Sequence, residues 1–175
     1  MRRWTVWLPL AGFALVALLV GLQLRVPPNA PIQSRLVGKP LPDFALPAAV
    51  PGTPGLASAG FRTGQPRLLN VFASWCVPCV AEAPQLLALR RAGARIDGIA
   101  IRDRPEDVAD FLRRNGNPYA AIGGDARSEV QLALGSAGVP ETFVIDGRGR
   151  IAAQHIGVIT EDDVPVLLQA LEAAR

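Results

Sequence analysis

The two cysteines of this 175-residue chain, Cys76 and Cys79, stand two residues apart in the run Ser74-Trp75-Cys76-Val77-Pro78-Cys79. This C-x-x-C spacing is typical of redox-active thiols. The apolar run 68–73 predicts a buried strand before the pair, and residues 80–89 predict a helix after it, so Cys76 falls at the helix start. Unpaired N–H groups and the positive end of the helix dipole favour a thiolate there. We therefore expect the pKa of the Cys76 thiol to be lowered and Cys76 to be a nucleophile.

Three other uses of the pair compete with redox chemistry. A structural zinc site needs four ligands, and beside the cysteine pair the chain offers only the single His155. A copper carrier would also depend on His155, because Met1 is the sole methionine. A structural disulfide across so short a loop would constrain the unfolded chain very little. Redox catalysis without a bound metal is the favoured interpretation, and a copper chaperone remains the alternative.

An uncharged run from Trp4 to Leu24 opens the chain, and its length suits a bilayer-spanning helix of about twenty residues. Trp4 and Trp7 stand at one end of the run, as interfacial anchors do. The alternative is a cleaved signal peptide, which needs small residues at a cleavage site, and the candidate Ala30 is followed by proline. We expect residues 1–25 to form an uncleaved membrane anchor.

Basic residues at the start of the chain predict its orientation. Arg2 and Arg3 precede the run and only Arg25 closely follows it, so the positive-inside rule places the N-terminus in the cytoplasm and the rest of the chain outside it. The same three arginines account for the whole net charge of +3, since 15 basic and 15 acidic residues follow Arg25. A neutral exported domain gives no electrostatic reason to expect nucleic acid as a partner.

The remaining residues suffice for one globular domain. Residues 26–38 are rich in proline and predict a stiff spacer, which leaves 39–175 as the domain. Up to about residue 66 the chain predicts loops, with a short strand at 43–46. Further strands are expected at 95–101, 119–122, 142–146 and 151–155, the last two as an antiparallel hairpin.

Helices are expected between these strands. Asp103 and Glu106 form a capping-box pattern for a helix ending at Asn115-Gly116. A second helix begins at Asp125 and ends near Gly135, and Thr160 caps a last amphipathic helix. The alternation of strands and helices predicts an α/β sandwich.

The pattern resembles the thioredoxin superfamily and, within it, the membrane-anchored thiol:disulfide interchange proteins of cytochrome c maturation, the DsbE/CcmG type. The motifs that carry the resemblance span nearly the whole exported domain: residues 36–44, 70–79, 116–119 and 135–143. The W-C-x-P-C element indicates only the superfamily. The narrower resemblance to the DsbE/CcmG type depends on the motif Gly-x-x-Gly-x-Pro-Glu-Thr-Phe and on the insert ending at 116–119. Two residues depart from the family pattern, Phe72 where tryptophan is common and Ser136 where valine is common. The resemblance implies a thioredoxin-like sandwich with a central mixed β-sheet and flanking helices, preceded by an N-terminal transmembrane helix.

The resemblance also implies roles for individual residues. Cys76 attacks the client disulfide and Cys79 resolves the mixed disulfide. Pro140 is a cis-proline facing the cysteines, which leaves the N–H and carbonyl of Val139 free to pair with an extended client. Trp75 packs beside Cys76 and limits access to it.

Two acidic residues complete the implied site. Glu82 and Glu141 resemble the acidic groups that this family keeps near its cysteines, where a partly buried carboxylate can take the proton of the resolving thiol. For Glu82 an exposed position on the helix surface is the competing interpretation. His155 is expected to pack or hydrogen-bond and to take no part in catalysis.

By resemblance, the function is that of an oxidoreductase in the periplasm, anchored by a single pass in the bacterial inner membrane. It would reduce the C-x-x-C-H disulfide of apocytochrome c or act with haem-ligation components. A membrane thiol transporter would re-reduce it, and no cofactor would be needed beyond the Cys76–Cys79 disulfide. A copper chaperone or assembly factor for a respiratory oxidase, and a general or oxidising member of the fold, stay open as alternatives.

Overall fold

A computed structural model describes residues 7–23 and 34–175, which belong to two separate compact units. In the first unit, helix α1 (Trp7–Gln23) contains no charged residue. Within residues 7–23 and 34–175, no helix combines the length and the apolarity that crossing a membrane requires. The rest of the expected anchor, 1–6 and 24–25, and most of the expected spacer lie outside the described residues.

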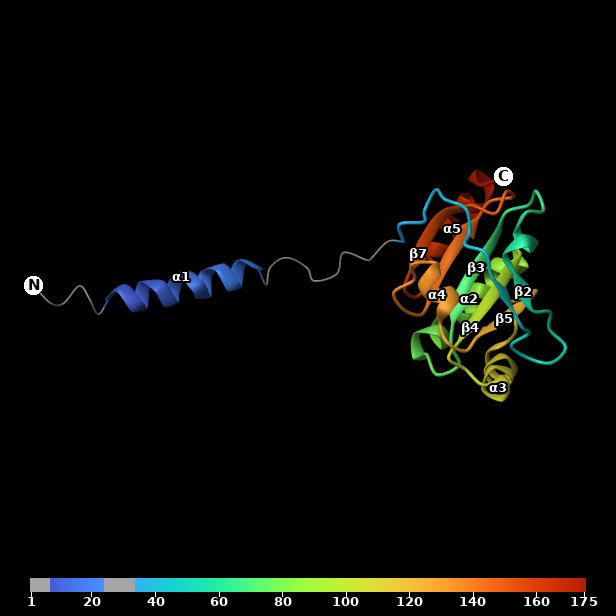
Figure 1. Ribbon diagram of the computed structural model, residues 1–175, viewed down its shortest axis with the longest axis horizontal. Coiled ribbons are helices and arrows are strands. Elements are labelled where there is room, and N and C mark those ends of the chain that lie inside the picture. Colours follow the sequence, from blue (N-terminus) through green and yellow to red (C-terminus); the bar gives the residue numbers. More distant parts are fainter. Residues whose placement is uncertain (1–6, 24–33) are drawn as a thin grey trace, which may run out of the picture. The chain divides into compact units, whose positions relative to one another are not determined.

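The second unit is built on a five-stranded mixed sheet in the order β5-β4-β3-β6-β7 (Figure 1). Its central strand β3 is buried along its whole length, runs parallel to β4 and pairs antiparallel with β6. β5 extends the sheet beside β4 in parallel, and β7 closes the other edge antiparallel to β6. The strands span Arg67–Phe72 (β3), Ile96–Ile101 (β4), Ile122–Asp125 (β5), Glu141–Ile145 (β6) and Ile151–Ile156 (β7).

Helices and short elements surround this sheet (Figure 1). Helix α2, which starts directly after the first cysteine, packs against both α3 and α5. The short pair β1–β2 lies against β5. Their bounds are Val77–Arg91 (α2), Pro105–Asn115 (α3), Glu129–Ala133 (α4), Asp163–Ala173 (α5), Ala45–Leu46 (β1), Leu56–Ala57 (β2) and the 3-10 helix Ser58–Phe61 (η1). The expected α/β sandwich with a central mixed sheet and flanking helices is confirmed.

An aromatic stack fixes the sheet near the cysteines. The rings of Phe72 and Tyr119 are stacked with centroids 4.7 Å apart, and Phe111 of α3 lies 5.6 Å from Phe72. Gly98 makes room for this stack, because a Cβ atom there would come within 2.9 Å of the Phe72 ring and 3.0 Å of the Tyr119 ring. The insert ending at Tyr119 therefore contributes a core residue.

The expected helix starts at Asp103 and Asp125 are wrong, although both carboxylates accept hydrogen bonds from backbone N–H groups. Asp103 does not cap α3, which begins at Pro105 after Arg104, and its carboxylate binds Ser74 instead. Asp125 ends β5, which lies further along the chain than the expected 119–122, and α4 begins only at Glu129. The Asp125 carboxylate still accepts the N–H groups of Glu129 and Gln131, so it holds the start of α4 from the strand.

The last helix also begins later than expected. Thr160 is not its cap, since α5 starts at Asp163. The N–H and hydroxyl of Thr160 both donate to the Asp163 carboxylate, which lowers the pKa of Asp163. A threonine that looked like a capping acceptor in the sequence is a donor in the structure.

Residues 34–38, assigned to the spacer from the sequence, are part of the folded unit. Ser34 is buried, its N–H donates to Gln154 Oε1 and its hydroxyl donates to the carbonyl of Leu134. Gly38 then donates its N–H to the carbonyl of Ile151 in β7. The folded unit thus begins before residue 39.

Candidate active site

Cys76 and Cys79 form a disulfide at the start of α2, with their Cα atoms 5.3 Å apart. Cys76 is the N-cap residue, and its Sγ accepts the N–H of Cys79 at 3.1 Å. Both cysteines are buried, Cys76 at 4% and Cys79 at 1% exposed, while the neighbouring side chains of Trp75 and Val77 are exposed. The expected position of Cys76 at the helix start is confirmed.

Glu82 lies three residues after Cys79 on α2 and is fully buried, which excludes an exposed position on the helix surface. Its Oε1 accepts from Asn70 Nδ2 at 3.0 Å, and its Oε2 accepts from the N–H of Ile159 at 3.1 Å. Burial raises the pKa of Glu82 from 4.5 to about 7, and the two hydrogen bonds oppose this rise only in part. A carboxyl with this pKa can both take and give a proton near neutral pH.

A buried polar network supports Glu82 from the sheet. The Tyr119 hydroxyl donates to Asn70 Oδ1 at 2.7 Å, and Asn70 Nδ2 also donates to Thr142 Oγ1 at 3.0 Å. Burial and the charge of Glu82 both raise the pKa of Tyr119 well above its ordinary value, so this hydroxyl stays a donor. No role was expected for Asn70 or Tyr119 from the sequence. The available signal was Asn70 itself, a polar residue within a strand that is otherwise apolar and buried.

Glu141 is buried at the start of β6, but it serves a different part of the site. Its carboxylate accepts the N–H of Ala137 at 3.1 Å and the side-chain N–H of Gln154 at 3.1 Å. Within residues 34–175 it makes no hydrogen bond to either cysteine or to Glu82. Glu141 therefore fixes the loop before β6 against β7.

That loop contains a cis peptide bond between Val139 and Pro140, as expected. The backbone N–H and carbonyl of Val139 make no hydrogen bond with any described residue, so both are available to a peptide. A groove of about 250 Å³ lies beside this residue and is also lined by Trp75, Arg102 and Leu132. The structure thus brings Trp75 and Val139, both expected at a client site, to one surface hollow.

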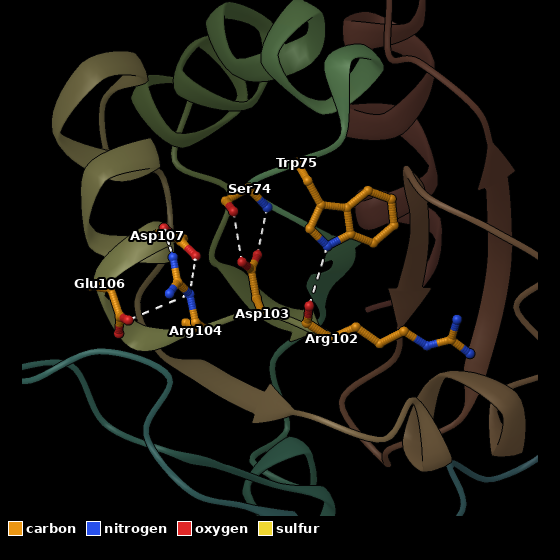
Figure 2. A network of polar contacts seen from close by, with 7 residues as sticks. All are labelled: Ser74, Trp75, Arg102, Asp103, Arg104, Glu106 and Asp107. Carbon is orange, nitrogen blue, oxygen red and sulfur yellow. Dashed lines mark hydrogen bonds and ion pairs between the residues drawn. The ribbon is translucent and has the colours of Figure 1, made fainter.

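Three hydrogen bonds join the active-site loop to the loop after β4 (Figure 2). Asp103 accepts the N–H and the hydroxyl of Ser74, each at 2.6 Å. Trp75 Nε1 donates to the carbonyl of Arg102 at 3.3 Å. Because Ser74 and Trp75 directly precede Cys76, these contacts fix the backbone that carries the nucleophile. Local sequence patterns do not reveal these contacts, since the partners are 29 and 27 residues apart.

His155 lies in β7, where its Nε2 is 3.2 Å from the carbonyl of Val158 and its Nδ1 is 3.9 Å from Asp163. These contacts agree with the expected packing and hydrogen-bonding position. Among the described residues, no group of three or more His, Cys, Asp or Glu side chains is placed to hold a metal ion.

Comparisons with known proteins agree with this geometry. The family model described as Redoxin matches residues 36–171. The chain is 40% identical over 175 residues to the thiol:disulfide interchange protein DsbE of Pseudomonas fluorescens biotype C, covering 98% of this chain and 97% of that protein. It is 39% identical to the thiol:disulfide interchange protein HelX of Rhodobacter capsulatus, covering 83% of this chain and 82% of the relative. A solved structure of a secreted thiol-disulfide isomerase from Corynebacterium glutamicum aligns with a TM-score of 0.64 at 26% identity, covering 83% and 95% of the two chains.

Proposed function

Because the chain belongs to the redoxin family, among the DsbE and HelX type of thiol:disulfide interchange proteins, we propose that it reduces the C-x-x-C-H disulfide of apocytochrome c during cytochrome c maturation. The chain is a thiol-disulfide oxidoreductase. The observation that carries the proposal is the Cys76–Cys79 pair at the start of α2 with the buried carboxyl of Glu82 one turn further on.

The first step forms a mixed disulfide. In the reduced protein the Cys76 thiolate, stabilised by the N-terminal N–H groups of α2, attacks one sulfur of the client disulfide. A new bond joins Cys76 Sγ to that sulfur, the client disulfide breaks, and the second client sulfur leaves as a thiolate. The client backbone lies extended beside Trp75 and pairs with the free N–H and carbonyl of Val139.

The second step releases the client. Glu82, as a carboxylate, takes the proton of the Cys79 thiol, and the Cys79 thiolate attacks Cys76 Sγ. The Cys76–Cys79 disulfide forms and the other client sulfur leaves as a thiolate. Two electrons have passed from the cysteine pair to the client, and no further cofactor takes part. A dithiol of a membrane thiol transporter then restores the reduced pair by the reverse exchange.

The location follows from the start of the chain. We place the domain in the periplasm of a bacterium, held to the inner membrane by a single pass over residues 1–25. This placement is supported by the uncharged run Trp4–Leu24 and by Arg2 and Arg3 ahead of it.

The test is a trapping experiment in cells that make c-type cytochromes. Cys79→Ala should accumulate a mixed disulfide between Cys76 and apocytochrome c, because the resolving thiol is gone. Cys76→Ala, the matched control, should trap nothing. Failure of the Cys79→Ala protein to trap any apocytochrome, in cells whose haem attachment needs the wild-type protein, would refute the direct reduction. Equal trapping of many unrelated proteins would instead indicate a general oxidoreductase.

A further inference from the structure

The groove beside Val139 is lined by residues from several separate segments. Trp75 precedes the nucleophile, Arg102 follows β4, Leu132 belongs to α4, and Val139 precedes the cis-proline. Leu132 is 66% exposed and Trp75 is 57% exposed, so the groove offers apolar surface to a bound chain. Of the described residues that line it, Arg102 alone carries a charge.

The backbone of Arg102 is held in an uncommon conformation. Its φ angle is +48°, in the left-handed region that residues other than glycine rarely adopt. Its N–H donates to the carbonyl of Asp125, and its carbonyl accepts from Trp75 Nε1. Such conformations persist where surrounding contacts impose them, and they gather at ligand-binding positions. Here the contacts on both sides fix the point from which the Arg102 side chain leaves the backbone.

The guanidinium of Arg102 has no ion-pair partner among the described residues. Carboxylates of the same loop, of α3 and of α4 have other partners: Asp103 accepts from Ser74, Asp107 pairs with Arg104, and Glu129 pairs with Arg127. Figure 2 shows the Arg102 side chain extending away from the Arg104 cluster. An exposed cation is thus left at the groove with no internal carboxylate to neutralise it.

We propose that Arg102 determines client specificity by binding an acidic side chain that lies close to the client disulfide. The client is a peptide that pairs with Val139, places an apolar residue on Trp75 and Leu132, and brings a carboxylate to Arg102. An exposed pair of this kind contributes about 1 kcal/mol or less, so it selects among clients and does not by itself bind them. The inference rests on the proposed function only in assuming that the protein reduces its clients. The preference of Arg102 can be measured with any peptide disulfide.

The experiment measures kcat/KM for three synthetic C-x-x-C-H peptide disulfides that differ at one flanking position, which carries Glu, Gln or Lys. The varied residue is placed in turn at successive sites on both sides of the peptide disulfide, so that one of these sites falls next to Arg102. The wild-type protein should reduce the Glu peptide roughly fivefold faster than the Lys peptide at one register, with the Gln peptide between them. High salt should weaken this preference.

Two variants assign the preference to Arg102. Arg102→Gln should abolish the preference, so that the Glu, Gln and Lys peptides are reduced at equal rates by this variant, and Arg102→Glu should reverse it. The matched control is Arg104→Gln, a neighbouring exposed arginine paired with Asp107 and Glu106, which should keep the wild-type preference. A preference that survives in Arg102→Gln, or equal rates for Glu and Lys peptides at every register, would overturn the proposal. Failure to reduce any of the peptides, the neutral one included, would refute the proposed reductase function and with it this inference.

Discussion

Glu82 gives the sharpest test of the site, because its burial makes a prediction for stability as well as for catalysis. The carboxyl is buried under α2, and both of its oxygens face fixed donors, Asn70 Nδ2 and the N–H of Ile159. The donors favour the carboxylate and burial favours the neutral acid, and burial is the larger effect, so the pKa of Glu82 rises to about 7. The change to examine is Glu82→Gln, which keeps the shape and removes the titration.

The sign of the pH effect follows from the raised pKa. Below pH 4.5 the carboxyl is protonated in both the folded and the unfolded chain, so its contribution to stability is fully present there. As the pH rises toward 7 the unfolded chain ionises first, and the folded state loses stability until Glu82 itself ionises. One pH unit is worth about 1.4 kcal/mol, so the whole loss between pH 4.5 and 7 amounts to about 3 kcal/mol.

The stability assay is denaturant unfolding of the oxidised protein from pH 4.5 to 8. The free energy of unfolding of the wild-type protein should fall by about 3 kcal/mol relative to that of Glu82→Gln across this range. A constant difference between the free energies of unfolding of the two proteins is also expected. The single oxygen of the glutamine amide can accept from only one of the two N–H donors, and leaving the other buried donor unsatisfied costs about 1 to 3 kcal/mol. Glu106→Gln, on the exposed surface of α3, should follow the wild-type curve.

The kinetic assay is a single-turnover reaction with a peptide disulfide, quenched at intervals to measure the mixed disulfide. Glu82→Gln should form the mixed disulfide at the wild-type rate and resolve it roughly a hundredfold more slowly at pH 7, since the proton acceptor for Cys79 is missing. Two results would refute the reasoning. One is a wild-type stability curve parallel to that of Glu82→Gln, and the other is resolution at the wild-type rate in the variant.

Two more outcomes are expected from the contacts around the cysteines. In the reduced protein, alkylation across pH should modify Cys76 before Cys79, because Cys76 is the N-cap residue of α2 and the free N–H groups there favour its thiolate. Labelling of Cys79 first, identified by mass spectrometry, would reverse the assigned roles. Asp103→Ala should lower the free energy of unfolding by about 2 kcal/mol, since it leaves two donors of Ser74 without their charged acceptor. Both losses are measured by denaturant unfolding. Asp110→Ala, which breaks only an exposed pair on α3, should cost less than about 1 kcal/mol, and equal losses for the two variants would show that the Asp103–Ser74 hydrogen bonds contribute no more than an exposed ion pair.

Local patterns predicted those features of the fold whose partners are near in sequence. The apolar run before the cysteines became β3, the helix start at Cys76 was placed correctly, and the turn at 147–149 joins the expected hairpin. These elements depend on hydrophobic periodicity, capping geometry and turn residues, all of which act over a few positions.

Contacts between distant segments could not be predicted in this way. Asp103 has the spacing of a capping box with Glu106, yet it binds Ser74 on another loop. The position of Glu82 on its helix likewise did not reveal whether its carboxyl faces solvent or is buried and accepts a hydrogen bond from the Asn70 amide. Where a polar side chain could satisfy a local or a distant partner, the packing of the sheet decided the outcome.

The hydrogen bonds of Ser34 connect the start of the folded unit to the client groove. Ser34 binds Gln154, Gln154 binds Glu141, and Glu141 binds the N–H of Ala137, so a continuous row of hydrogen bonds leads from the first described residue of the domain to the wall of the groove. The residue that opens the folded unit is therefore three hydrogen bonds away from Ala137 in the groove wall, although the two are about a hundred positions apart in the chain. Loss of any one of these hydrogen bonds would separate the start of the folded unit from the loop that carries the cis-proline.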